Sequence, residues 1–82
     1  MKIVWDERKR LANVEKHALD FADITVDFFW TAKAFPVRTG RLMAVGLIQG
    51  KATTVIFRPL GTEGVSIISM RPASLRERNK LI

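Results

Sequence analysis

The 82-residue chain contains no cysteine and no tyrosine, and it has a single histidine. The missing cysteines exclude a disulfide framework and thiolate metal sites, and one histidine cannot supply an ordinary zinc site, so we expect no metal and no cofactor. The missing tyrosines exclude a tyrosine acid or base. No apolar run approaches the ~20 residues needed to span a bilayer, and the charged start lacks the apolar region of a signal peptide. We therefore expect one soluble, cytoplasmic domain over residues 1–82 with no membrane contact.

Basic residues are in excess, and they are unevenly distributed. The formal net charge is +6, from 14 Lys and Arg against 8 Asp and Glu. By segment, residues 1–20 carry +1, residues 21–32 carry −2, and residues 33–82 carry +7, from nine bases and two acids. Such an excess favours binding to a polyanion through phosphate contacts. Charge alone leaves open that these side chains only keep the protein soluble.

Two helices are expected in the first part of the chain, over residues 7–17 and 21–31. Asp6 and Asp20 precede them and are good N-cap residues. Apolar residues recur at spacings of three and four in both segments. The stripe of the second helix consists of Phe21, Ile24 and Phe28, widened by Phe29 and Trp30. We therefore expect this second helix to be mostly buried, and its aromatic residues to lie in the core or at a partner interface.

The second part of the chain has the composition of strands joined by glycine-containing turns. Residues 2–5 are expected to form an edge strand or an extended lead-in. Ser74 is placed to cap a short C-terminal helix over residues 73–80. The strands of the second part are expected over residues 33–38, 41–48, 52–59 and 65–71. The predicted fold is α+β, with two N-terminal helices, a four-stranded antiparallel meander sheet and a short C-terminal helix.

Three arginines are expected at the ends of these strands. Arg41 begins its strand, whereas Arg58 and Arg71 end theirs. In an antiparallel meander Arg41 and Arg58 should be neighbours, while Arg71 falls towards the opposite end of the sheet. The positions of the three arginines therefore predict a row of basic residues along the sheet in preference to one compact site.

These residues permit cleavage of RNA without a metal. The reaction needs a base for the 2′-hydroxyl, cations for the charge that develops on the phosphate, and an acid for the leaving oxygen. Arginine suits the second task because its planar fork binds phosphate bidentately. Histidine titrates near neutral pH, so His17, or else Glu15 or Glu77, could carry the protons. The alternatives are structural: a helix C-cap for His17 and a solvated helix face for Glu77.

The order of several short motifs resembles that of the BrnT family of bacterial type II toxins, which are related in fold to RelE-like ribonucleases. No single motif is specific, but their order covers nearly the whole chain. The matching pieces are W-D-E at 5–7, Asn13, K-H at 16–17, Phe21-Ala22, Phe28-Phe29, G-R-L-M-A-V-G at 40–46, Arg58, I-I-S-M-R-P-A at 67–73 and Glu77-Arg78.

The resemblance implies a metal-independent endoribonuclease toxin that cleaves RNA and inhibits translation. A BrnA-like antitoxin with a ribbon-helix-helix domain would neutralise it, contact operator DNA on behalf of the complex, and allow a toxin–antitoxin heterotetramer. The site residues that the resemblance implies are His17, Arg41, Arg58, Arg71 and Glu77 for catalysis, and Lys16 and Arg78 for substrate binding. The competing hypothesis is a non-catalytic nucleic-acid-binding or co-repressor module, a degenerate toxin.

Overall fold

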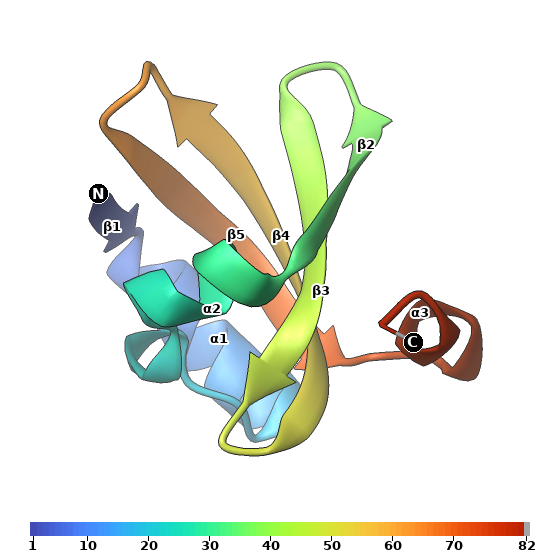
Figure 1. Ribbon diagram of the computed structural model, residues 1–82. Coiled ribbons are helices and arrows are strands. Elements are labelled where there is room, and N and C mark those ends of the chain that lie inside the picture. The colour runs from blue at the N-terminus through green and yellow to red at the C-terminus, as the bar shows by residue number, and fades with distance from the viewer. Residues whose placement is uncertain (82) are drawn as a thin grey trace.

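The structure is a computed structural model that describes residues 1–81. A five-stranded sheet forms its centre, with the strand order β1-β5-β4-β3-β2. Figure 1 shows α1 and α2 on one side of this sheet and α3 away from them. The elements are β1 (Lys2–Trp5), α1 (Glu7–His17), the 3-10 helix η1 (Phe21–Asp23), α2 (Val26–Thr31), β2 (Lys33–Arg38), β3 (Arg41–Ile48), β4 (Lys51–Leu60), β5 (Gly64–Pro72) and α3 (Leu75–Asn79).

The sheet confirms the predicted meander of β2 to β5 and corrects its size. β1 pairs in parallel with the first part of β5, from Lys2↔Gly64 to Trp5↔Ile67, so the sheet has five strands and is mixed. Glycine at position 64 permits this approach, because a Cβ there would lie 2.6 Å from the Lys2 carbonyl oxygen. The prediction of a purely antiparallel four-stranded sheet was therefore wrong at this edge.

The core lies between the sheet and the helices of the first part of the chain. Phe21 and Phe28 are almost completely buried there, as predicted from their stripe. Phe28 packs directly over Gly46 of β3, where a Cβ would lie only 2.9 Å from the ring. The absence of a side chain at this position therefore brings α2 close to the sheet.

The predicted helix over residues 21–31 is interrupted. Ile24 and Thr25 both have extended backbone angles, and they separate η1 from α2. The Thr25 hydroxyl accepts a hydrogen bond from the Phe28 N–H at 3.4 Å and so begins a new helix. The expected burial was also wrong for one aromatic residue, because Trp30 is 80% exposed.

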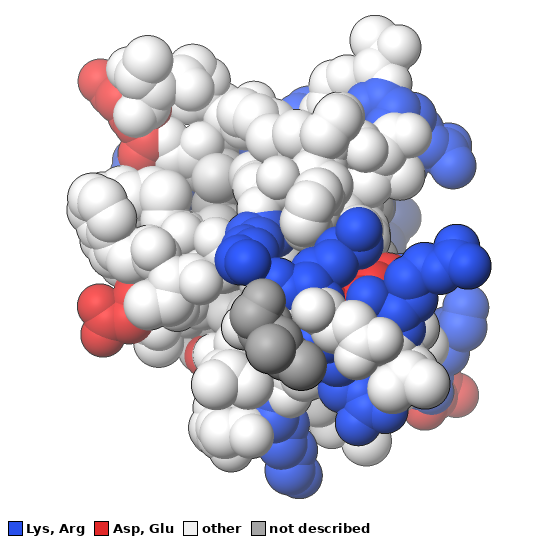
Figure 2. All heavy atoms as spheres, turned by 45° about the vertical axis from the view of Figure 1, so that its right-hand side comes forward, with Lys and Arg blue, Asp and Glu red and all other residues white. Residues whose placement is uncertain are grey.

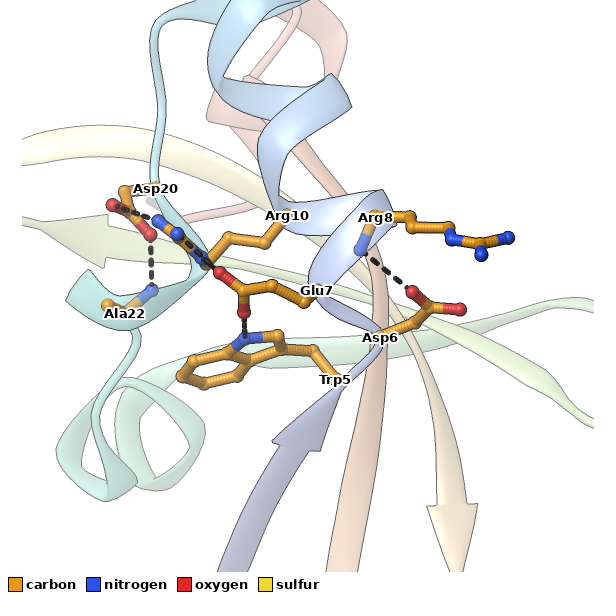
Figure 3. Close-up of polar contacts among 7 residues, drawn as sticks. All are labelled: Trp5, Asp6, Glu7, Arg8, Arg10, Asp20 and Ala22. Carbon is orange, nitrogen blue, oxygen red and sulfur yellow. Dashed lines mark hydrogen bonds and ion pairs between the residues drawn. The ribbon is translucent and has the colours of Figure 1, made fainter.

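The W-D-E segment is part of a polar network around the start of α1 (Figure 3). The Glu7 carboxylate accepts hydrogen bonds from Trp5 Nε1 at 3.1 Å and from Arg10 Nε at 2.6 Å. Arg10 reaches on to Asp20 at 2.9 Å, and Asp20 caps η1 by accepting from the Ala22 N–H at 2.9 Å. This network fixes the end of β1, the start of α1 and the start of η1 relative to one another, so a structural role accounts for these motif residues.

The C-terminal helix is shorter than predicted but is capped as predicted. The Ser74 hydroxyl accepts from the Glu77 N–H at 3.1 Å, and the Glu77 carboxylate accepts from the Ser74 N–H at 2.9 Å, which is a capping box. Among residues 1–81, no helix has the length and apolar character needed to cross a membrane.

Candidate functional site

The three arginines predicted at strand ends, Arg41, Arg58 and Arg71, lie on one face of the sheet. This face is opposite the one that α1 and α2 cover. The register Leu42↔Phe57 continues to Arg41 opposite Arg58, so these two side chains are cross-strand neighbours, as expected. Arg71 pairs with Thr54, which lies four residues from Arg58 along β4 and on the same face. At ~3.3 Å per residue, Arg71 is offset by about 13 Å along the strands from the Arg41–Arg58 pair. The arginines form a rim along this face.

Basic side chains gather around α3, which lies on the same face. Figure 2, in which the side of the molecule that bears α3 comes forward, shows Lys and Arg over this region with little acidic surface among them. Arg78 is exposed on α3, and the Lys80 ammonium lies 4.7 Å from the centre of the Phe35 ring on β2. The last helix therefore adds to the positive surface that the strands present.

Arg71 is held in place by Glu77. Arg71 Nη1 and Nη2 donate to the two carboxylate oxygens of Glu77 at 2.7 and 2.8 Å. The Thr54 hydroxyl donates to the same carboxylate at 2.8 Å. The Glu77 side chain is 12% exposed and the Arg71 side chain 39% exposed, so α3 is attached to the sheet through a bidentate ion pair in which only the carboxylate is largely buried.

These contacts determine the protonation state of Glu77. The hydrogen bonds from Arg71, supported by those from Ser74 and Thr54, lower the pKa of Glu77 to about 2, although burial opposes the shift. The carboxylate therefore has no proton to donate near neutral pH and is a weak base. In this geometry the Glu77 carboxylate orients the Arg71 guanidinium through two hydrogen bonds.

On its other side Arg71 borders a hollow between α1 and β5. β1 pairs only with the first part of β5, and α1 lies along the remainder. This α1–β5 hollow has a volume of about 400 Å³. Its lining residues are Lys9, Ala12, Asn13, Lys16, His17, Ile68, Ser69 and Arg71. The structure thus brings Lys16, His17 and Arg71 together, and leaves Arg41 and Arg58 farther along the sheet.

Asn13 fixes the two walls of this hollow relative to each other. It is 6% exposed, and its side-chain amide donates to the Leu19 carbonyl and accepts from the Met70 N–H, both at 3.0 Å. The second contact satisfies a backbone donor on the part of β5 that β1 does not cover. Asn13 therefore positions the end of α1, with Lys16 and His17, against the strand that carries Arg71.

The sequence interpretation included Asn13 and Ser69 only as parts of a resemblance and did not single out Lys9 or Thr54. Asparagine has a low helix propensity, so its presence inside a charged helix was the available signal for Asn13. Nothing local marked the other three. Within residues 1–81, no cluster of three or more His, Asp or Glu side chains could hold a metal ion.

Comparison with known proteins identifies the family of the chain. Residues 5–77 match the family described as "Ribonuclease toxin, BrnT, of type II toxin-antitoxin system". The chain is also similar to the Brucella abortus ribonuclease toxin BrnT, known from a crystal structure at 1.1 Å resolution, with 55% identity and a TM-score of 0.85. This similarity covers 90% of the present chain and 97% of the Brucella chain. No curated protein matches the chain.

Proposed function

The chain belongs to the BrnT family of ribonuclease toxins of type II toxin–antitoxin systems, and on this premise we propose how its arginine face cleaves RNA. Cleavage takes place in the α1–β5 hollow, where Arg71 and His17 meet the scissile phosphate. The Arg41–Arg58 pair binds the RNA backbone farther along the strand. The observation that carries the proposal is the position of Arg71, anchored by Glu77 on one side and bordering the hollow with His17 and Lys16 on the other.

The proposed reaction needs no metal. The ribose 2′-oxygen attacks the adjacent phosphorus, the bond from phosphorus to the 5′-oxygen breaks, and the products are a 2′,3′-cyclic phosphate and a 5′-hydroxyl. One proton leaves the 2′-hydroxyl and one arrives at the 5′-oxygen. The imidazole of His17 is the proton carrier, since Glu77 is held as a carboxylate by Arg71.

The guanidinium of Arg71 is suited to the charge that develops on the phosphate. Of its five N–H groups, one on Nη1 and one on Nη2 donate to Glu77, and Nη1 also lies 3.4 Å from the Pro72 carbonyl oxygen. The Nε–H and the second Nη2–H share an edge and form a fork that fits two phosphate oxygens. Lys16 adds positive charge at the hollow, and Arg78 adds it along the bound RNA.

The test is induced expression without antitoxin, together with cleavage of RNA by the purified protein. We expect Arg71→Ala and His17→Ala to lower the cleavage rate by about 10²-fold or more. Arg41→Ala and Arg58→Ala should mainly weaken RNA binding. Each should also lower the slope of log binding constant against log salt concentration by the amount expected for about one lost phosphate contact. Arg8→Ala, an exposed arginine of α1, is the matched control.

The cleavage assay also distinguishes the alternatives. If EDTA abolishes cleavage and Mg²⁺ restores it, the metal-independent mechanism is wrong. Arginine and histidine variants that fold and remain fully toxic would place the active site elsewhere. Salt-dependent RNA binding without any cleavage products would instead indicate a non-catalytic co-repressor.

We further propose that the partner is a BrnA-like antitoxin with a ribbon-helix-helix domain, which binds operator DNA for a cytoplasmic heterotetramer. Acidic residues of such a partner would complement the basic surface around α3 and exclude RNA from it. Co-expression with the small reading frame beside the toxin gene tests this proposal. Recovery of a complex, and relief of growth inhibition, are the expected results.

A further inference from the structure

The most exposed large aromatic side chain of the protein lies on α2. Trp30 is 80% exposed, whereas Phe28, two positions earlier, is 3% exposed and packs against the sheet. Phe29 lies between these extremes, with its ring 5.1 Å from that of Phe57. A six-residue helix can bury only one side, and successive side chains are turned by about 100°, so Trp30 points away from the core.

Trp30 is part of an apolar groove. The groove has a volume of about 240 Å³ and is lined by Met1, Val26, Phe29 and Trp30. Met1 is itself 56% exposed. Val26 precedes Trp30 by four residues and therefore lies beside it on the helix surface. An apolar groove of this kind, bordered by an exposed tryptophan, is typical of a protein interaction site.

The residues that lead into α2 and form it carry net negative charge, in contrast to the rest of the chain. Residues 21–32 contain Asp23 and Asp27 and no basic residue, while the whole chain carries +6. Both carboxylates are exposed, and Asp27 lies one turn before Trp30 on α2. They line a second hollow, of about 420 Å³, with Thr25, Thr31 and Gln49, whereas the lining of the groove itself is apolar.

This α2 surface, defined by Met1, Asp23, Val26, Asp27, Phe29 and Trp30, lies on the helix-covered side of the sheet, away from the arginine face. Its charge disfavours RNA or DNA, because carboxylates repel a phosphate backbone. It favours a protein segment that presents an apolar side chain to the groove and Lys or Arg to the two aspartates.

We propose that the α2 surface docks a basic, amphipathic segment of the antitoxin. The inference rests on the antitoxin partnership of the proposed function. The antitoxin then contacts two sides of the toxin: an acidic part covers the arginine face, and a basic part with an apolar anchor binds at α2. Because the second contact leaves the arginines accessible, it adds affinity without itself blocking RNA.

The experiment measures binding of the purified antitoxin to the full toxin chain, carried in an Arg71→Ala background so that the toxin can be produced alone. Trp30→Ala should raise the Kd about thirtyfold, the effect typical of a tryptophan at the centre of an interface. Asp23→Asn with Asp27→Asn should lower the association rate and flatten its dependence on salt. Leu11→Ala, at an equally apolar position of α1 that is 56% exposed, is the matched control and should leave the Kd unchanged.

Two further readouts complete the test. In the otherwise native chain, Trp30→Ala should cleave RNA at the unaltered rate and unfold at the unaltered urea concentration, because the side chain is outside the core. Light scattering of the toxin alone should give the mass of a monomer, both for the parent chain and for Trp30→Ala.

Unchanged antitoxin affinity in Trp30→Ala, with binding by the parent chain intact, would overturn the docking proposal and leave the proposed function standing. Failure of the parent chain to bind the antitoxin would overturn both. A toxin dimer that Trp30→Ala dissociates would show that a second copy of this chain occupies the groove, and would overturn the choice of antitoxin. Loss of RNA cleavage in the Trp30 variant would instead assign the surface to the substrate.

Discussion

Replacing Glu77 with glutamine removes a charge that the structure holds in a defined ionisation state. The pKa of Glu77 lies at about 2, against an ordinary value of 4.5. One pKa unit corresponds to ~1.4 kcal/mol, so the difference makes ionised Glu77 a contributor of up to about 3 kcal/mol to folding. A domain of this size is stable by about 4–12 kcal/mol in total, at ~0.05–0.15 kcal/mol per residue. Glu77→Gln should therefore remove a large part of the stability at neutral pH.

The pH dependence gives the prediction its sign. Because the pKa of Glu77 is lowered on folding, its contribution is fully present above about pH 4.5 and is lost as the pH falls towards 2. The glutamine variant has no such titration. The difference in unfolding free energy between the two proteins should be largest at pH 7, at up to about 3 kcal/mol, and should shrink towards zero near pH 2.

Urea unfolding at a series of pH values measures this difference, with tryptophan fluorescence as the signal. Trp5 is a suitable reporter because its ring packs edge-on against buried Phe21, with the ring centres 6.3 Å apart. Glu63→Gln, at an exposed glutamate between β4 and β5, is the control and should change the curve little. If native protein and Glu77→Gln lost stability in parallel between pH 5 and pH 2, the described anchoring of α3 would be refuted.

Three other substitutions test local features of the fold. Ala18→Gly should raise the unfolding free energy by about 0.5–1 kcal/mol, since Ala18 has a φ of 58° after α1; a fall in melting temperature would contradict this. Gly46→Ala should lower the free energy of unfolding by about 1–3 kcal/mol, because its Cβ would stand 2.9 Å from the Phe28 ring. Urea unfolding checks this. An unchanged midpoint would show that α2 moves to make room for the methyl group. Asn13→Ala should lower the free energy of unfolding by about 1–3 kcal/mol, because the Met70 N–H loses its partner. The variant should also cleave RNA more slowly in the fraction that remains folded. Full cleavage activity would show that Asn13 does not position the site.

Local signals in the sequence predicted the local structure well. The bounds of α1, β2 and β3 agree with the predictions, and Asp6, Asp20 and Ser74 all cap helices as expected. Such features depend on a few neighbouring residues: a capping side chain, an apolar spacing or a glycine in a turn. The neighbouring positions of Arg41 and Arg58 could be predicted because a hairpin determines its own register.

Features that depend on distant parts of the chain left no comparable signal. The parallel pairing of β1 with β5 joins segments from opposite ends of the chain, and neither segment alone distinguishes an edge strand from a lead-in. Trp30 is exposed because the helix breaks at Ile24 and Thr25. The regular apolar spacing over residues 21–31 predicted one continuous helix and gave no sign of this break. The anchoring of Arg71 by Glu77 requires α3 to fold back over the sheet, which spacing in the sequence does not reveal.

The pairing of β1 with β5 also has a consequence for the order of folding. The hairpins from β2 to β5 connect neighbouring segments and can form early, whereas closing the long loop between β1 and β5 has a greater entropic cost. The Asn13 contact with Met70 spans 57 residues and is subject to the same delay. The α1–β5 hollow, whose two walls come from distant segments, is therefore completed late in folding, after the hairpins have formed.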